Sequence, residues 1–409
     1  MSLKIIDYLF IFFGSLLLFL FSSLGWMEEN FMNVKPAIYI IFFSFICLNS
    51  LNIFKYLKGI YLINIKNLDF YILLSIILFF IIQKEINLYA ISFLSLYIFI
   101  STLYSHSIES RSFNLNIVLY CIFISGLFST LGIYAGFFES LLFQSSLLHE
   151  VQPINYPNPT STIIKNLTGF SLSNHISGFQ ISINYSAYSI ISSLAVCNFL
   201  PLKGSLKKAI NLLFVFALLL TQAKVGLIYI AILIVLKVSK NMAIQIKYSF
   251  IFLICLGYLL LTHITIIETN SIIISNKYYR ELAFSFFNYD FYLSLFSWLK
   301  LVAFEYIKSS NFINADLNGY FQISGNMEPH SLFFSSILIG GLGFAFLLLA
   351  RILLIIKNYF SHSNSQEDFF TSAMSVFVIE SFLLDSYDLP VFWLIILLAK
   401  NYQIINIKK

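Results

Sequence analysis

Long apolar runs constrain the fold of this chain more than any other feature. Hydrophobic residues make up 59% of its 409 residues and charged residues only 11%, whereas a soluble domain has about 25% charged residues. A chain this apolar cannot cover itself with polar surface in water, so its solvent is lipid. The formal net charge of +5 lies mostly between the apolar runs. It therefore indicates membrane orientation, and no nucleic-acid partner is expected.

The apolar runs predict an all-α polytopic integral membrane protein, because a helix that crosses the bilayer needs about 20 apolar residues. We expect about twelve transmembrane helices in a single domain, residues 1–409. The predicted spans are Tyr8–Leu24, Ala37–Phe54, Phe70–Ile82, Ile86–Tyr104, Ile117–Phe137, Ile181–Leu200, Ile210–Thr221, Val225–Val238, Tyr248–Thr265, Leu332–Ile356, Phe369–Leu384 and Val391–Ile405. The pair divided by Gln222-Ala223-Lys224 could form one long helix with a polar centre. We favour two spans joined by a tight turn, because the topology then stays consistent.

Lysine and arginine residues indicate how the spans are oriented. With both termini in the cytoplasm, the predicted cytoplasmic segments hold about twice as many basic residues as the outer ones. A large outer loop, residues 266–331, then lies between the ninth and tenth spans. Its many aromatic residues predict short helices at the membrane surface. The other long outer loop, residues 139–180, contains three prolines and is predicted to be irregular.

The sequence contains no recognisable nucleotide-binding or metal-binding motif. Its four cysteines all lie inside apolar runs without a paired spacing, so we interpret them as packing residues. We therefore expect no cofactor and no metal. Any chemistry would draw its energy from an activated substrate or an ion gradient.

A histidine at the predicted entry to the tenth span is the first candidate for chemistry. In Met327-Glu328-Pro329-His330, the proline fixes the start of the helix and places His330 at the outer interface. A histidine there can act as a general base, with Glu328 as a supporting residue. The alternative is an interfacial histidine that hydrogen-bonds a backbone group.

Two cations on the predicted outer side are candidates for binding an anion. Lys224 interrupts an apolar stretch at a predicted turn, where a phosphate is its natural partner; snorkelling to the interface is the alternative. Arg280, beside Tyr279, has the planar fork that suits phosphate, or it forms a surface ion pair with Glu281. Asn184, near the outer start of the sixth span, could hydrogen-bond a sugar or a neighbouring helix.

Four stretches, taken in order, resemble the O-antigen ligase and O-antigen polymerase superfamily of bacterial inner-membrane glycosyltransferases. They are Ile183-Asn184-Tyr185-Ser186-Ala187, Leu220-Thr221-Gln222-Ala223-Lys224-Val225-Gly226, Pro329-His330-Ser331-Leu332 with Gly340-Gly341-Leu342-Gly343, and Leu384-Asp385-Ser386 with Leu389-Pro390-Val391-Phe392-Trp393. The resemblance extends from about residue 181 to the C-terminus. The large outer loop before the histidine also fits this family.

The resemblance implies a glycosyltransferase that uses a glycan linked to undecaprenyl pyrophosphate as its donor. A hydroxyl of the acceptor sugar would attack the anomeric carbon, and undecaprenyl pyrophosphate would leave. His330 would activate that hydroxyl, while Arg280 and Lys224 would bind the pyrophosphate. The family has arginine where this chain has Lys224, which keeps the charge but loses the bidentate fork. The family often has asparagine after the histidine, where this chain has Ser331.

Three functions remain open within this interpretation. We favour an O-antigen or surface-polysaccharide polymerase, which joins lipid-linked repeat units at the periplasmic face of the bacterial inner membrane. The alternatives are an O-antigen ligase that transfers the glycan to lipid A-core, and a transporter or flippase for lipid-linked oligosaccharide. A transporter would carry charged residues inside several spans, whereas Glu380 is the main such residue here. Expected partners are the lipid-linked oligosaccharide, an acceptor glycan, membrane lipid and a chain-length regulator protein.

Overall fold

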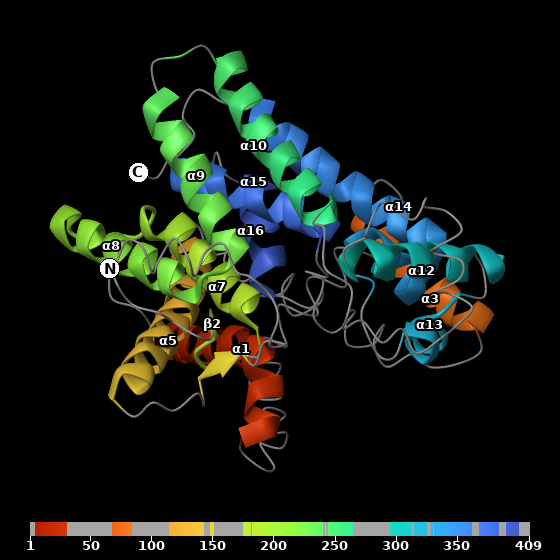
Figure 1. Ribbon diagram of the computed structural model, residues 1–409, viewed down its shortest axis with the longest axis horizontal. Helices are drawn as coiled ribbons and strands as arrows, with labels where there is room; N and C mark the ends of the chain where they lie inside the picture. The colour runs from red at the N-terminus through yellow and green to blue at the C-terminus, as the bar shows by residue number, and fades with distance from the viewer. Residues whose placement is uncertain are drawn as a thin grey trace.

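The computed structural model describes residues 5–30, 68–83, 114–142, 148–150, 175–180, 182–239, 242, 244–264, 295–311, 315–324, 329, 331–361, 368–383 and 390–400. Within these residues the chain is helical apart from one short strand pair (Figure 1). The helices are α1 (Ile5–Asn30), α3 (Leu68–Gln83), α5 (Asn114–Leu142), α7 (Ile183–Cys197), α8 (Gly204–Thr221), α9 (Lys224–Val238), α10 (Ile244–Ile264), α12 (Leu295–Ser309), α13 (Leu317–Ser324), α14 (Leu332–Ser361), α15 (Asp368–Leu383) and α16 (Pro390–Lys400).

Ten of these helices coincide with predicted spans. The remaining two predicted spans, Ala37–Phe54 and Ile86–Tyr104, lie outside the described residues. Among the described residues, three helical segments are long and apolar enough to cross a membrane: Asn116–Ser140, Gly204–Thr221 and Leu332–Phe360. The all-helical character and the presence of helices of membrane-spanning length are therefore confirmed. The number of spans and their orientation stay predictions.

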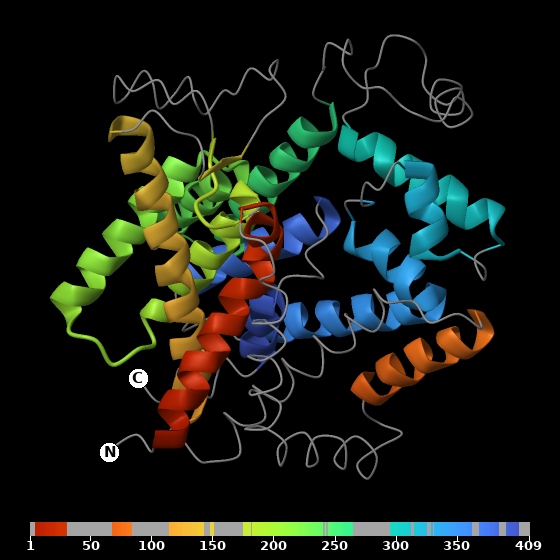
Figure 2. The same cartoon turned by 90° about the horizontal axis from the view of Figure 1, so that it is seen from below.

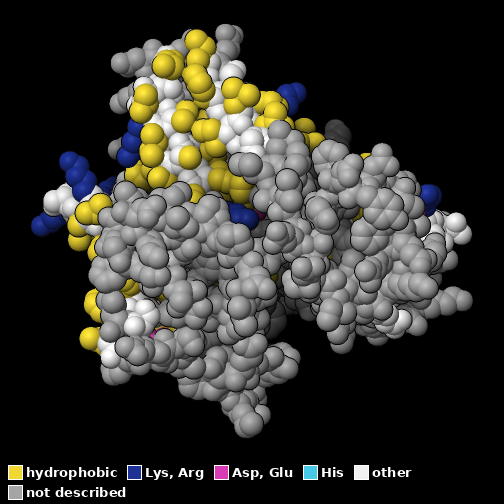
Figure 3. All heavy atoms as spheres, viewed as in Figure 1, with side chains coloured by type: hydrophobic (Ala, Val, Ile, Leu, Met, Phe, Trp, Pro, Cys, Tyr) yellow, Lys and Arg dark blue, Asp and Glu magenta, His cyan; other side chains and the backbone are white. Residues whose placement is uncertain are grey.

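The outer surfaces of α8 and α10 are apolar, as expected of helices that face lipid. Exposed large hydrophobic side chains on these two helices are Leu206, Leu212, Leu213, Phe216, Ile246, Phe250, Phe252, Leu253 and Leu256. Figure 3 shows hydrophobic side chains gathered over the region where Figure 1 places α9 and α10. A contiguous apolar surface of this kind is rare on soluble monomers, whereas it is the normal surface of a helix that faces lipid.

Small and hydroxyl-bearing residues pack α5 against α7. Figure 2 shows α1 and α5 side by side, and α7 packs on α5 as well. A side chain at Gly126 would collide with Ser193 of α7, so the two backbones approach closely there. The Ser193 hydroxyl donates to the carbonyl of Ile122 at 2.9 Å, which links the two helices. Close packing through small residues is how helices associate in lipid.

Gly341 divides α14 into two helices. Its φ of 80° and ψ of 172° are not helical, and only glycine adopts them readily. The two halves fold against each other, because the rings of Phe333 and Phe346 lie 5.8 Å apart. Figure 2 shows this bend beside α3. The segment Leu332–Ile356 is therefore helical and of spanning length, as predicted, but it is interrupted at Gly341 and is not one straight helix. Nine residues span only about 13 Å, so the first half is too short to cross a bilayer.

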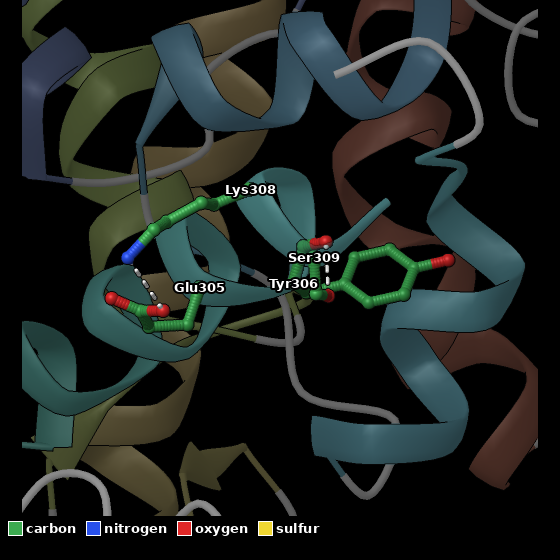
Figure 4. A network of polar contacts seen from close by, with 4 residues as sticks. All are labelled: Glu305, Tyr306, Lys308 and Ser309. Atoms are coloured by element: carbon green, nitrogen blue, oxygen red, sulfur yellow. Dashed lines mark hydrogen bonds and ion pairs between the residues drawn. The ribbon is translucent and has the colours of Figure 1, made fainter. Parts of the chain in front are cut away.

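Two short helices, α12 and α13, lie within the predicted outer loop, in agreement with its predicted helical content. On α12, Lys308 pairs with Glu305 at 3.6 Å, and the Ser309 hydroxyl donates to the Tyr306 carbonyl at 2.9 Å. Figure 4 shows that the Tyr306 ring points away from this ion pair. Partial burial and the nearby Asp316 carboxylate raise the pKa of Tyr306. Asp316 in turn begins α13 by accepting a hydrogen bond from the Gly319 amide.

The strand pair joins the two ends of the other long predicted loop. Strands β1 (His149–Glu150) and β2 (His175–Ile176) are antiparallel, and His149 lies opposite Ile176. The carbonyl of Leu148 accepts backbone hydrogen bonds from Ser177 and Gly178 at 3.1 and 3.0 Å. These contacts hold the chain that enters α7 against the end of α5.

Candidate functional site

A tight turn of two residues joins α8 to α9. Gln222 ends α8 in the left-handed region, with a φ of 56° and a ψ of 16°. The Thr221 hydroxyl fixes the turn because it donates to Leu218 at 2.7 Å and accepts from the Ala223 amide at 3.2 Å. The prediction of two helices joined at this point is confirmed, and Lys224 is the first residue of α9.

The first turn of α9 offers several hydrogen-bond donors. The N-cap residue Ala223 has no side chain that could accept from the helix amides. In the described part of the chain, the amides of Lys224 and Val225 meet no acceptor. The Lys224 side chain is exposed, while the Gln222 amide nitrogen is buried and finds no partner there. A helix N-terminus with free amides and a cation is a site that favours an anion.

A buried carboxylate lies close to this turn. Glu380, three residues before the end of α15, is 1% exposed. Its Oε2 accepts a hydrogen bond from the Tyr188 hydroxyl of α7 at 3.2 Å. The Tyr258 hydroxyl of α10 also interacts with this carboxylate. The second oxygen, Oε1, is buried and has no hydrogen-bond partner among the residues that the structure describes.

Two lysine residues interact with the Glu380 carboxylate. Lys224 of α9 and Lys300 of α12 both interact electrostatically with the carboxylate. Lys224 makes no ion pair within 4.0 Å in the described residues, so its ammonium group is not held against a carboxylate there. Within the described residues, Lys224 therefore offers a positive charge that an anionic ligand could neutralise.

Aromatic packing fixes the position of Tyr188 within the cluster. Its ring stacks on Phe377 of α15 with centroids 5.4 Å apart, and Phe377 meets Phe392 of α16 edge-on at 5.8 Å. Phe377 precedes Glu380 by three residues on the same helix, so both lie on the face of α15 that packs against α7. The tyrosine ring and the carboxylate are thereby held by the same helix pair.

The adjacent face of α15 borders an apolar groove. The groove lies between α15 and the two halves of α14. Leu332 and Phe333, at the start of α14, line it together with Ser381 of α15. Ser381 directly follows Glu380. The entry to α14 and the Glu380 cluster therefore lie on neighbouring faces of the same turn of α15.

Four of the predicted site residues lie outside the described residues: His330, Arg280, Tyr279 and Glu328. The neighbours of His330 are described, because Pro329 and Ser331 are both buried and α14 begins at Leu332. Lys224 lies at the start of α9, as expected of a residue at a turn. Asn184 lies in the first turn of α7. Its backbone N–H donates a hydrogen bond to the hydroxyl of the N-cap residue Ser182 at 3.3 Å.

Asn184 precedes Tyr188 by one helical turn and lies on the same face of α7. Sequence reasoning did not select Glu380, Tyr188, Tyr258, Lys300 or Gln222 as site residues. Glu380 carried a usable signal, since an ionisable residue inside a span marks a functional site by default. Tyrosines are common throughout this chain, so Tyr188 and Tyr258 carried none.

Within the described residues, no group of three or more His, Cys, Asp or Glu side chains is arranged to hold a metal ion. The expectation that the protein uses neither a metal nor a cofactor stays a prediction. The arrangement offers a cation, free helix amides and a buried acceptor, a set of groups suited to a ligand with an anionic part and a hydroxyl-bearing part.

Comparisons of this chain with protein-family models, with curated proteins and with solved structures gave no match.

Proposed function

We propose that the protein is a glycosyltransferase that uses a lipid-pyrophosphate-linked glycan, and within that class a surface-polysaccharide polymerase. One observation carries the proposal: Lys224, Glu380 and the entry to α14 gather around the last two turns of α15. Lys224 and the entry to α14 come from two of the four stretches that resemble the O-antigen ligase and polymerase superfamily, and Glu380 lies four residues before a third. Because these stretches are far apart in sequence but close together in the fold, their proximity supports the proposal that they act in one site.

The chemistry of the Lys224 turn suits the leaving group of this reaction. When the glycosyl bond breaks, negative charge grows on the pyrophosphate, and cations and helix amides that are already in place stabilise it. Lys224 with the free amides of α9 meets this requirement without a metal. In the proposed reaction, Arg280 adds a bidentate contact, and His330 accepts the proton from the attacking hydroxyl.

The second candidate is a transporter of lipid-linked oligosaccharide, and Glu380 is the observation that favours it. A carboxylate buried between helices is typical of proton-coupled transport. The transporter would move the glycan without forming a bond. Product analysis therefore separates the two functions, because only the polymerase lengthens the glycan.

The first experiment is deletion of the gene in the source strain, followed by a gel of surface polysaccharide and analysis of lipid-linked glycans. A polymerase deletion leaves a single repeat on lipid A-core and removes the ladder. A ligase deletion leaves bare core while long polymer accumulates on the carrier lipid. A transporter deletion leaves single repeats on the cytoplasmic side. An unchanged ladder with an unchanged lipid-linked pool would refute all three.

Complementation with variants tests the site. Lys224→Ala should lower polymer formation about 10- to 100-fold, because a charge-assisted hydrogen bond contributes about 1.5–3 kcal/mol. Lys224→Arg should retain activity, since arginine supplies the same charge and a bidentate fork. Lys208→Ala is the matched control, because Lys208 is an exposed lysine at the other end of α8. His330→Ala and Arg280→Ala should abolish activity while the protein remains in the membrane.

A further inference from the structure

Glu380 presents a buried acceptor that lacks a donor. The residue is 1% exposed, and only one of its oxygens, Oε2, receives the hydrogen bond from Tyr188. Oε1 finds no donor in the described part of the chain. A buried carboxylate oxygen without a donor destabilises a fold by about 1–3 kcal/mol or more. Such an atom calls for an explanation, and a donor supplied by a bound ligand is one that fits a carboxylate beside a cation.

The chemistry of the cluster restricts what that partner can be. The missing group must donate a hydrogen bond, because an ionised carboxylate only accepts. A phosphate oxygen is excluded at this atom, since it would bring a second negative charge against the carboxylate. A neutral hydroxyl satisfies both conditions. Tyr188 and Tyr258 already show that hydroxyl groups reach this carboxylate.

We propose that Glu380 Oε1 binds a hydroxyl group of the glycan whose pyrophosphate is held at Lys224. The inference rests on the proposed function and extends it from the pyrophosphate to the sugar. Lys224 interacts electrostatically with Glu380, so one substrate can reach both groups. Its charged part lies against the cation and its sugar against the carboxylate. Tyr188 is a positioning residue, because it holds Oε2 and thereby leaves Oε1 for the ligand.

The variant Glu380→Gln separates this role from a structural one. Tyr188 donates its proton, so the amide oxygen of glutamine takes the place of Oε2 and the amide nitrogen takes that of Oε1. The side-chain volume stays the same, and an acceptor becomes a donor at one atom. The variant also removes a buried charge, so the fold should be at least as stable as that of the wild type.

The test measures the binding of two probes to purified full-length protein in nanodiscs. The first is the lipid-pyrophosphate-linked repeat unit extracted from the deletion strain, and the second is undecaprenyl pyrophosphate without a sugar. Glu380→Gln should weaken binding of the glycan-bearing probe about 10- to 100-fold. It should bind the bare pyrophosphate at least as tightly as the wild type, because a negative charge that interacts with Lys224 is gone. Lys224→Ala should weaken binding of both probes.

The melting temperature and a matched control complete the design. Glu380→Gln should not lower the melting temperature, whereas a purely structural role would lower it and weaken both probes together. Glu305→Gln is the control, because Glu305 Oε1 is likewise buried without a hydrogen-bond partner in the described residues, while its Oε2 pairs with Lys308 at 3.6 Å and it lies on α12, outside the Glu380 cluster. It should bind both probes normally.

Equal binding of the glycan-bearing probe by wild type and Glu380→Gln would overturn the inference, as would failure of the wild type to bind that probe. Turnover is measured separately on the same samples. If the wild type binds the glycan-bearing probe but never lengthens it, the proposed polymerase function fails. The binding comparison still decides the role of Glu380.

Discussion

Adding one methyl group at Gly126 should force α5 and α7 apart. A Cβ atom at this position would lie 2.5 Å from the Ser193 Cβ and 2.8 Å from the Ser189 carbonyl oxygen. The carbonyl belongs to the α7 backbone, so it cannot rotate away as a flexible side chain could. The helices must therefore separate by several tenths of an ångström. Overpacking of this kind costs about 1–3 kcal/mol.

The separation also weakens a hydrogen bond between the helices. Ser193 donates to the Ile122 carbonyl at 2.9 Å, and it can turn to the Ser189 carbonyl of its own helix at 3.0 Å. Loss of the contact to Ile122 adds about 0.5–1.5 kcal/mol. The better helix propensity of alanine offsets about 1 kcal/mol of these two losses. Gly126→Ala should therefore destabilise the protein by about 0.5–3.5 kcal/mol in all.

Reversible unfolding of the purified protein in mixed micelles measures this change. Gly257→Ala is the matched control, because no atom lies within 4 Å of the added carbon on α10. It should be neutral or stabilising, since alanine is the better helix former. Changing Ser193 to glycine in the Gly126→Ala background should recover part of the loss. If Gly126→Ala proves as stable as Gly257→Ala, the close approach of α5 and α7 is refuted.

Two further predictions concern the broken helix and the buried carboxylate. Gly341→Ala should destabilise the protein by about 1–3 kcal/mol, because the φ of 80° suits only glycine and the added carbon would lie 2.7 Å from the Phe79 ring. Gly343→Ala, with nothing within 4 Å, is its control in the same unfolding assay, and equal stability would contradict the bend. Tyr188→Phe should cost about 1–3 kcal/mol by removing the donor from Glu380 Oε2. Adding Glu380→Gln to Tyr188→Phe should recover stability, because the unpaired charge is gone; additive losses would argue against their hydrogen bond.

The long apolar runs of the sequence predicted the positions of most helices in the described part of the chain. Ten helices coincide with predicted spans, because a run of about 20 apolar residues has few stable structures in lipid other than a helix. The break at Gln222 was predictable for the same reason, since a polar Gln-Ala-Lys segment does not continue an apolar helix. Both conclusions depend on local composition, which the sequence shows directly.

The bend at Gly341 was not predictable in the same way. Its four-residue stretch was noticed as rich in glycine, but glycine is common in membrane helices that stay straight. At the bend, the ring of Phe79 from α3 occupies the space that a side chain on Gly341 would need. That contact joins residues more than 250 positions apart, so no local pattern contains it.

The residues of the candidate site also differ in whether the sequence alone could select them. Lys224 could be selected from sequence because a charge that interrupts an apolar stretch is costly wherever it lies. Tyr188 and Tyr258 could not be selected, because their importance comes from Glu380 on a third helix. The sequence by itself determined that the chain is helical, apolar outside and charged at its turns, since burial and solvation act on each residue separately. Only the tertiary structure decided which polar groups meet, because a hydrogen bond between helices depends on how they pack.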